Sequence, residues 1–141
     1  MTVRPDEKAR QILHNAKLYT TRARIGILKV LMQAAGPLRQ DQIGERLTSR
    51  TLNKATVYRT LESLLTAGLV HRVSLDDRAW HFELADHCTE KQCHPHFTCT
   101  NCGVTHCLTD ITLPLAQIPP RKGFIISRQQ VRLEGLCPAC A

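Results

Sequence analysis

The chain has 141 residues and a net charge of +7, with 43% hydrophobic and 22% charged residues. This balance is typical of a globular protein and excludes a disordered chain. The charge is uneven, because residues 1–84 carry 14 Lys and Arg against 8 Asp and Glu, whereas residues 85–141 carry 5 against 4. The basic half favours a polyanion such as DNA as partner, although a solvated surface also accounts for such charge.

The first part of the chain predicts three helices. The first covers residues 5–17. The second begins at a cap on Thr20 or Thr21 and runs to residue 35. The third covers residues 40–47, where apolar side chains again recur at helical spacing.

A fourth helix begins after Asn53, whose side chain suits an N-cap, and ends at Gly68, where a left-handed C-cap belongs. Residues 69–73 and 79–84 then alternate between apolar and polar side chains around a turn at residues 76–78, which predicts a β-hairpin. Helices followed by a hairpin in this order indicate a winged helix. Its last helix is expected to lie in the major groove of DNA.

Candidate DNA contacts lie early in the fourth helix and at the start of the second. They are Lys54, Thr56, Tyr58 and Arg59, together with Tyr19, Arg22 and Arg24. Guanidinium, ammonium and hydroxyl groups are the donors that base edges and phosphates require. A solvated helix surface is the alternative interpretation of the same residues.

The remainder of the chain predicts a smaller, mixed structure. Residues 86–95 are polar and suit a hinge, and residues 97–108 and 124–136 carry β-type patterns, with a short helix expected over 113–118. The fold class is therefore α+β. We expect a winged-helix DNA-binding domain over 1–85, a hinge over 86–95 and a small α/β metal-binding domain over 96–141.

Two Cys-x-x-Cys pairs, Cys99/Cys102 and Cys137/Cys140, predict a structural zinc site. Two residues between cysteines let both thiolates reach one ion, and four sulfurs fill a tetrahedron without an open position. The alternative is a thioredoxin-like redox motif, which neither pair favours because neither lies between a strand and a helix. Zinc at this position would join the two ends of the C-terminal half.

Further Cys and His residues indicate a second metal site. The candidates outside the first site are His71, His87, Cys88, Cys93, His94, His96 and Cys107, with Glu83 and His81 near them on the hairpin. His94 and His96 point to the same side of an extended strand. Cys107 is expected on a strand antiparallel to the strand of His96. Mixed imidazole and thiolate ligands favour zinc over iron or manganese.

These features together resemble the ferric uptake regulator (Fur) family of bacterial metalloregulators. The resemblance covers nearly the whole chain and rests on Thr56-Val57-Tyr58-Arg59-Thr60-Leu61, Ala67-Gly68-Leu69-Val70, Phe82-Glu83-Leu84, the His94-to-Cys102 segment and Cys137-x-x-Cys140. It implies a homodimer whose C-terminal α/β domain dimerises. Such a dimer binds an inverted-repeat DNA operator when loaded with metal and represses uptake or stress genes.

The resemblance also implies roles for the ligands. The four cysteines of the two Cys-x-x-Cys pairs match the structural zinc site of the family. Glu83, His94, His96 and Cys107 match its regulatory site, where many members have a carboxylate in place of the cysteine. His71 and Cys88 resemble ligands of the zinc-sensing branch of the family.

The chain departs from the common family pattern at Pro37, Pro95 and Gln129, where many members have His, Asp and His. An additional metal site of some members is therefore expected to be absent. The resemblance of His71 and Cys88 to ligands of the zinc-sensing branch, together with the sulfur content, favours a zinc-uptake regulator, with Zn²⁺ as the second, regulatory metal, over an iron-, manganese- or peroxide-responsive member. Two hypotheses of a different class stay open: a thiol-based redox sensor using Cys88, Cys93 or Cys107, and a constitutive DNA-binding module.

We expect no enzymatic activity. The sequence has no N-terminal apolar run typical of a signal peptide and no stretch long enough to cross a membrane, which predicts a cytoplasmic protein. In a reducing compartment, seven cysteines indicate metal or redox chemistry and not a disulfide framework.

Overall fold

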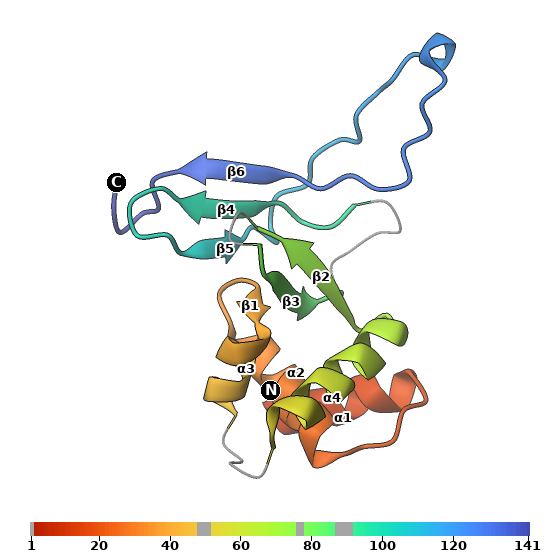
Figure 1. Ribbon diagram of the computed structural model, residues 1–141, viewed down its shortest axis with the longest axis vertical. Coiled ribbons are helices and arrows are strands. Elements are labelled where there is room, and N and C mark those ends of the chain that lie inside the picture. Colours follow the sequence, from red (N-terminus) through yellow and green to blue (C-terminus); the bar gives the residue numbers. More distant parts are fainter. Residues whose placement is uncertain (1, 48–51, 76–77, 87–91) are drawn as a thin grey trace. The chain divides into compact units, whose positions relative to one another are not determined.

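The computed structural model describes residues 2–47, 52–75, 78–86 and 92–141. The chain forms two compact units, Met1–Ala85 and Asp86–Ala141, and each is considered by itself. Helices dominate the first unit and strands the second (Figure 1). This mixture of helix and sheet confirms the predicted α+β class.

The first unit contains four helices and a three-stranded sheet. The helices are α1 (Pro5–Asn15), α2 (Arg22–Gln33), α3 (Gln40–Arg46) and α4 (Lys54–Thr66), and the strands are β1 (Leu38–Arg39), β2 (Val70–Ser74) and β3 (Trp80–Leu84). The strand order is β1-β3-β2, and both pairings are antiparallel. The order of helices and hairpin is the predicted winged-helix arrangement, to which β1 adds a short strand that was not predicted.

Local capping explains where the helices begin and end. The Thr21 side chain accepts a hydrogen bond from the Arg24 N–H (3.2 Å), which decides between the two predicted caps of α2. Asn53 caps α4 by accepting from the Thr56 N–H (2.8 Å). Gly68 ends α4 with a φ of 75° and donates to the Leu65 carbonyl (3.0 Å), as its predicted role requires.

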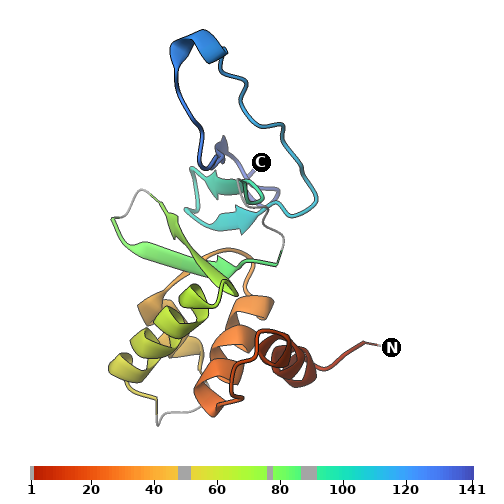
Figure 2. The ribbon, with the colours of Figure 1, turned by 90° about the vertical axis from the view of Figure 1, so that its right-hand side faces the viewer.

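An aliphatic core holds the first unit together. Fully buried side chains reach it from every helix and from the sheet: Leu13, Ile27, Ile43, Leu64 and Val70. Figure 2 shows α4 and the β2–β3 hairpin on one side of the unit and α1 on the other. The outward face of α4 therefore stays available to a partner. None of the helices in the described ranges combines the length and apolar character needed to cross a bilayer.

The β2–β3 hairpin pairs Val70 with Leu84 at one end and Ser74 with Trp80 at the other. Residues 76 and 77 of the predicted turn lie outside the described part of the chain. Arg78, the third predicted turn residue, has a φ of 63°, in the left-handed region that tight turns use.

The second unit contains a small three-stranded sheet. Its strands are β4 (His96–Cys99), β5 (Thr105–Cys107) and β6 (Arg132–Gly135), in the order β5-β4-β6. The central strand β4 is antiparallel to β5 and parallel to β6. A long excursion between β5 and β6 extends away from the sheet and contains a 3₁₀ turn, η1 (Pro120–Lys122) (Figures 1 and 2).

Two predictions for this unit are wrong. Residues 113–118 form no helix, and of the predicted strand 124–136 only Arg132–Gly135 belongs to a ladder, apart from an isolated bridge between Gln92 and Gln129. The side chains of these two glutamines explain the first error. Gln92 Nε2 donates to the Leu113 carbonyl (2.6 Å), and Gln129 accepts from the Ala116 N–H (2.7 Å). These bonds, with Pro114 inside the segment and Pro119 directly after it, keep its backbone from forming a helix.

Candidate functional site

The two Cys-x-x-Cys pairs form tight turns. The N–H of Gly103 donates to the Cys99 carbonyl and that of Cys140 to the Cys137 carbonyl, each at 2.9 Å. Gly103 has a φ of 75°, which favours glycine at this position. The parallel pairing of β4 with β6 places Cys99 opposite Gly135. The second turn follows that residue directly and so lies beside the first.

The four sulfur atoms lie within 4.8 Å of one another. The Sγ atoms of Cys102 and Cys137 are 3.8 Å apart. A tetrahedral zinc ion with Zn–S bonds of about 2.3 Å separates its sulfurs by about 3.8 Å. Cys99 and Cys137 are buried, Cys140 is half-buried and Cys102 is exposed. The cluster therefore has the size and the donor type of a closed zinc site.

Backbone donors tune the thiols of this cluster. The N–H groups of Cys102 (3.5 Å) and Cys137 (3.4 Å) donate to Cys99 Sγ and lower the pKa of Cys99 to about 6. The Val104 N–H lowers the pKa of Cys102, but hydrogen bonding with Cys99, burial and the other two thiols raise it to about 11. The cluster thus favours one thiolate near neutral pH, and a thiolate is the form that binds metal.

A second group of metal-binding side chains lies on the other end of the same strands. His96 pairs with Cys107 across β4 and β5, which confirms the predicted antiparallel pairing. The Leu108 N–H donates to the Pro95 carbonyl (2.9 Å) and extends this pairing. The rings of His94 and His96 are 5.1 Å apart, and one nitrogen of each lies within 4.8 Å of the Cys107 sulfur.

Two other predicted ligands, His71 and Glu83, belong to the first unit. His71 and Glu83 face each other in the β2–β3 register of the first unit, and His71 Nε2 is hydrogen-bonded to the buried Glu83 carboxylate. Cys88 and His87 lie outside the described residues. Cys93 was predicted as a metal ligand or a reactive thiol, but it is disulfide-bonded in this structure. The expectation that the cysteines form no disulfide is therefore wrong at this residue.

The predicted DNA contacts lie on α4 and around the start of α2. Five of the seven have exposed side chains: Tyr19, Arg22, Lys54, Tyr58 and Arg59. The ring of Tyr19 is 89% exposed. Thr56 is half-buried. Arg24 is also half-buried, and its guanidinium is hydrogen-bonded within the unit.

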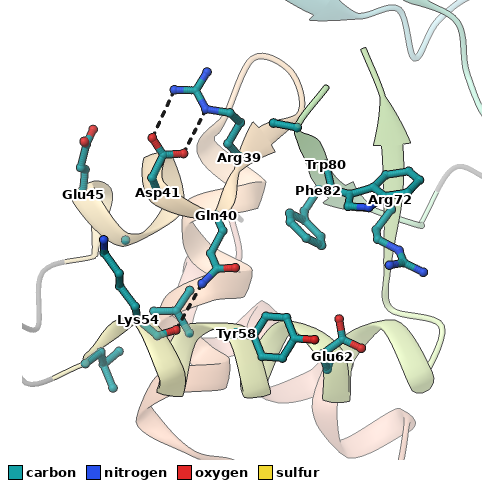
Figure 3. A pocket seen from close by; sticks show the side chains of 14 residues that line it. Arg39, Gln40, Asp41, Glu45, Lys54, Tyr58, Glu62, Arg72, Trp80 and Phe82 are labelled. Atoms are coloured by element: carbon teal, nitrogen blue, oxygen red, sulfur yellow. Dashed lines mark hydrogen bonds and ion pairs between the residues drawn. The ribbon is translucent and has the colours of Figure 1, made fainter. Parts of the chain in front are cut away.

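A groove of about 910 Å³ runs along α4, between α3 and the β2–β3 hairpin (Figure 3). Gln40 Nε2 donates to the Lys54 carbonyl (3.2 Å) and links α3 to the start of α4. On the hairpin side, the Arg72 guanidinium lies 4.9 Å from the centre of the Trp80 ring. Sequence reasoning missed this pair. The signal in the sequence was Trp80, the one tryptophan of the chain, which stands at an outward position of a strand with alternating side chains.

Comparison with known proteins shows which family the chain is similar to. The model of the ferric uptake regulator family matches residues 15–133. The ferric uptake regulation protein of Legionella pneumophila is 30% identical over 135 residues, which cover 92% of this chain and 96% of that protein.

Two solved structures share the fold. The Vibrio cholerae ferric uptake regulator has a TM-score of 0.62 at 24% identity, covering 91% of this chain and 98% of that chain. A zinc uptake regulator complexed with zinc and DNA has a TM-score of 0.64 at 21% identity, covering 98% and 95%. The family match runs from the end of α1 through the β2–β3 hairpin, β4 and β5, and it ends within β6, before Cys137 and Cys140. The chain belongs to the ferric uptake regulator family, and it is a metal-responsive transcriptional regulator of that family.

Proposed function

We propose that the chain is a zinc-responsive repressor that binds an inverted-repeat operator as a homodimer and controls genes of metal uptake or homeostasis. The observation that carries this proposal is the presence of two ligand groups on one small sheet. One group has four sulfurs, and the other combines His94, His96 and Cys107. Four sulfurs leave no open position and suit a permanent structural ion, whereas the three ligands of the second group leave a position open around their ion.

The structural ion is proposed to be Zn²⁺ on Cys99, Cys102, Cys137 and Cys140. The sulfur separations support this, because they already suit a tetrahedron around one ion. When bound, the ion supplies a cross-link between the turn after β4 and the turn after β6. Its binding energy then becomes folding energy for the second unit.

The regulatory ion is proposed to be Zn²⁺ as well. His94, His96 and Cys107 offer two imidazoles and a thiolate, a softer donor set than iron or manganese prefers. Glu83, His71 and Cys88 complete the proposed ligand set, and their inclusion rests on the resemblance of their positions to family ligands.

The DNA interface is proposed to consist of the α4 start and the segment before α2. Lys54, Tyr58 and Arg59 project from exposed positions of α4 and suit the major groove. Thr56 supports them with a hydroxyl. Tyr19 and Arg22 are assigned to the flanking DNA backbone or minor groove, whereas Arg24, predicted as a third contact there, directs its donors inward.

The homodimer is proposed to form through the second unit. Phe124 and Ile125 are 72% and 92% exposed there. Apolar side chains exposed to this degree on a unit with few buried ones suit coverage by a second copy.

Two competing functions differ in the signal that is sensed. An iron-, manganese- or peroxide-responsive regulator requires a site that prefers harder metals. A thiol-based redox sensor is favoured by one observation, the disulfide at Cys93. The effects of metal and of oxidant on DNA binding can therefore be measured separately with the same DNA.

The deciding experiment measures DNA binding by the full chain after mild chelation of loosely held metal. Duplexes are first selected from a random-sequence pool by the zinc-loaded protein and then titrated at buffered free zinc, iron or manganese. We expect zinc to restore binding at the lowest free concentration. Binding that is independent of metal contradicts the proposal, and binding lost only on peroxide treatment supports the redox sensor.

The recognition helix is tested with Arg59→Ala, which removes an exposed charge from the middle of the proposed interface. We expect DNA binding to be lost while zinc content stays unchanged, because the side chain contacts neither ligand group. Arg121→Ala is the matched control, since Arg121 is exposed on η1 of the second unit and belongs neither to the proposed DNA contacts nor to a ligand group. Retained binding by Arg59→Ala refutes the assignment of α4.

A further inference from the structure

Arg24 joins two parts of the first unit that are distant in sequence. Its Nη1 donates to the Tyr19 carbonyl (2.7 Å), and its Nη2 donates to Ser63 Oγ (3.0 Å). Tyr19 lies in the loop before α2, and Ser63 lies on α4. The planar guanidinium fork holds two such acceptors in one fixed geometry, which the ammonium of a lysine does not.

The loop before α2 is short and tightly constrained at both ends. The Leu18 N–H donates to the Leu13 carbonyl (2.9 Å), after Lys17 has turned the chain with a φ of 58°. At the other end, Thr21 caps α2 through the Arg24 N–H (3.2 Å). Between these anchors, the Tyr19 carbonyl is bonded to Arg24. The ring of Tyr19 nevertheless projects almost fully into solvent, so the backbone is fixed while the side chain stays available.

The other arginines of this surface are placed differently. Arg22 is exposed, and so is Arg59, whose Nε donates only weakly back to the Ala55 carbonyl of its own helix (3.4 Å). Their charges face solvent, as a contact with phosphate requires. Arg24 is half-buried and directs its donors inward. Among the predicted DNA contacts, Arg24 is thus the one whose guanidinium bridges α4 and the Tyr19 loop.

We propose that Arg24 is a positioning residue that fixes the Tyr19 loop at a set distance from the recognition helix α4, an inference that rests on the DNA-binding function proposed above. DNA then meets two contact elements that are already aligned. Without the clamp, the loop must be ordered during binding, and this ordering weakens affinity. The role is distinct from a phosphate contact, because its effect passes through Ser63 and Tyr19.

The first test uses Ser63→Ala, which removes the hydroxyl acceptor and changes no charge. Alanine favours a helix, so α4 is expected to fold normally. We expect the affinity of the zinc-loaded protein for its selected duplex to fall by about tenfold, with zinc content unchanged. Ser63→Thr retains the hydroxyl and should bind as the wild type does. Equal binding by Ser63→Ala and the wild type overturns the positioning role.

Salt dependence separates positioning from direct contact. Each lost phosphate contact lowers the slope of log affinity against log salt by about 0.9. We expect Arg22→Gln to reduce the slope and Arg24→Gln to weaken binding while leaving the slope unchanged. A reduced slope for Arg24→Gln makes Arg24 a phosphate ligand and overturns the proposal.

A double-mutant cycle tests whether the effect passes through Tyr19. If the clamp acts by placing Tyr19, Tyr19→Ala should cost much less affinity in a Ser63→Ala background than in the wild type. A role in general stability gives additive losses and overturns the proposal. If the wild type itself selects no duplex, the DNA-binding function fails and the positioning role with it. If the wild type binds and the cycle is additive, only the positioning role fails.

Discussion

The two units of this chain are stabilised by different kinds of side chain. The first has buried aliphatic residues on every helix, such as Ile27 and Leu64. In the described part of the second unit, the buried positions are Pro95, His96, Cys99 and Cys137, and the last three are candidate metal ligands. Burial of apolar surface therefore accounts for the first fold. In the second, metal ligands occupy the interior, and order should depend on the ion.

The largest effect is expected for Cys137→Ser, which opens the four-sulfur cluster. Structural zinc contributes about 10–16 kcal/mol in small domains that depend on it. We expect the tightly bound zinc and the β4–β6 pairing to be lost while the helices of the first unit persist. Metal analysis and residue-resolved hydrogen exchange measure the two changes. Retention of zinc and of amide protection at β4 would contradict the division between the units.

The converse change is Leu64→Ala in the first unit. Leu64 is fully buried, and truncation at such sites costs about 2–5 kcal/mol through lost burial and a residual cavity. We expect the free energy of unfolding of the first unit to fall by that amount and the zinc content to stay constant. Val3→Ala is the matched control in the same unit. Val3 is 58% exposed, and the effect of its truncation should stay within about 0.5 kcal/mol.

A change at the second ligand group should separate sensing from folding. We expect Cys107→Ser to raise the free zinc concentration needed for DNA binding by about 100-fold. The change removes a direct metal ligand, and loss of a group that only hydrogen-bonds to a ligand already lowers metal affinity by about 10–100-fold. The structural zinc should remain. His106→Ala, at the neighbouring position of β5, is the control and should respond as the wild type does. An unchanged zinc response in Cys107→Ser removes Cys107 from the regulatory site.

The smallest effect is expected for Asp6→Asn, which breaks a surface ion pair between α1 and α2. Lys29 Nζ lies 2.8 Å from the Asp6 carboxylate and lowers the pKa of Asp6 below 3.8, first through this hydrogen bond and then through its charge. A lowered pKa stabilises the fold above pH 3.8 and loses that effect as pH falls through the lowered value. The difference in Tm between variant and wild type should be small at neutral pH and vanish in strong acid. It should also vanish in high salt, and a difference that persists there contradicts the electrostatic explanation.

Much of this structure follows from local sequence. The caps at Thr21, Asn53 and Gly68 are local features, and so the helix ends agree with expectation within a few residues. The four-cysteine cluster is also foreseeable, since metal geometry restricts how Cys-x-x-Cys pairs are spaced. The antiparallel pairing of His96 with Cys107 follows from the tight turn between them.

The wrong predictions concern segments whose conformation depends on contacts between residues far apart in sequence. Residues 113–118 have helical composition, but the amides of Gln92 and Gln129 bond their backbone, and neither contact is visible in a local pattern. The same holds for Arg24, whose acceptor on Ser63 lies 39 residues away. Its residue type suggested a DNA contact, and only the folded unit reveals that its donors point inward. The regulatory ligand set stays a prediction.

The parallel pairing of β4 with β6 has a consequence for synthesis of the chain. Cys137 follows Cys99 by 38 residues, so the first Cys-x-x-Cys pair leaves the ribosome before the second pair has been made. At about 5–20 residues per second, this interval lasts about 2 to 8 seconds. During it the first unit is already complete, while Cys99 and Cys102 offer only half of a coordination shell. A newly made molecule thus completes its first unit before it is able to close the four-sulfur cluster.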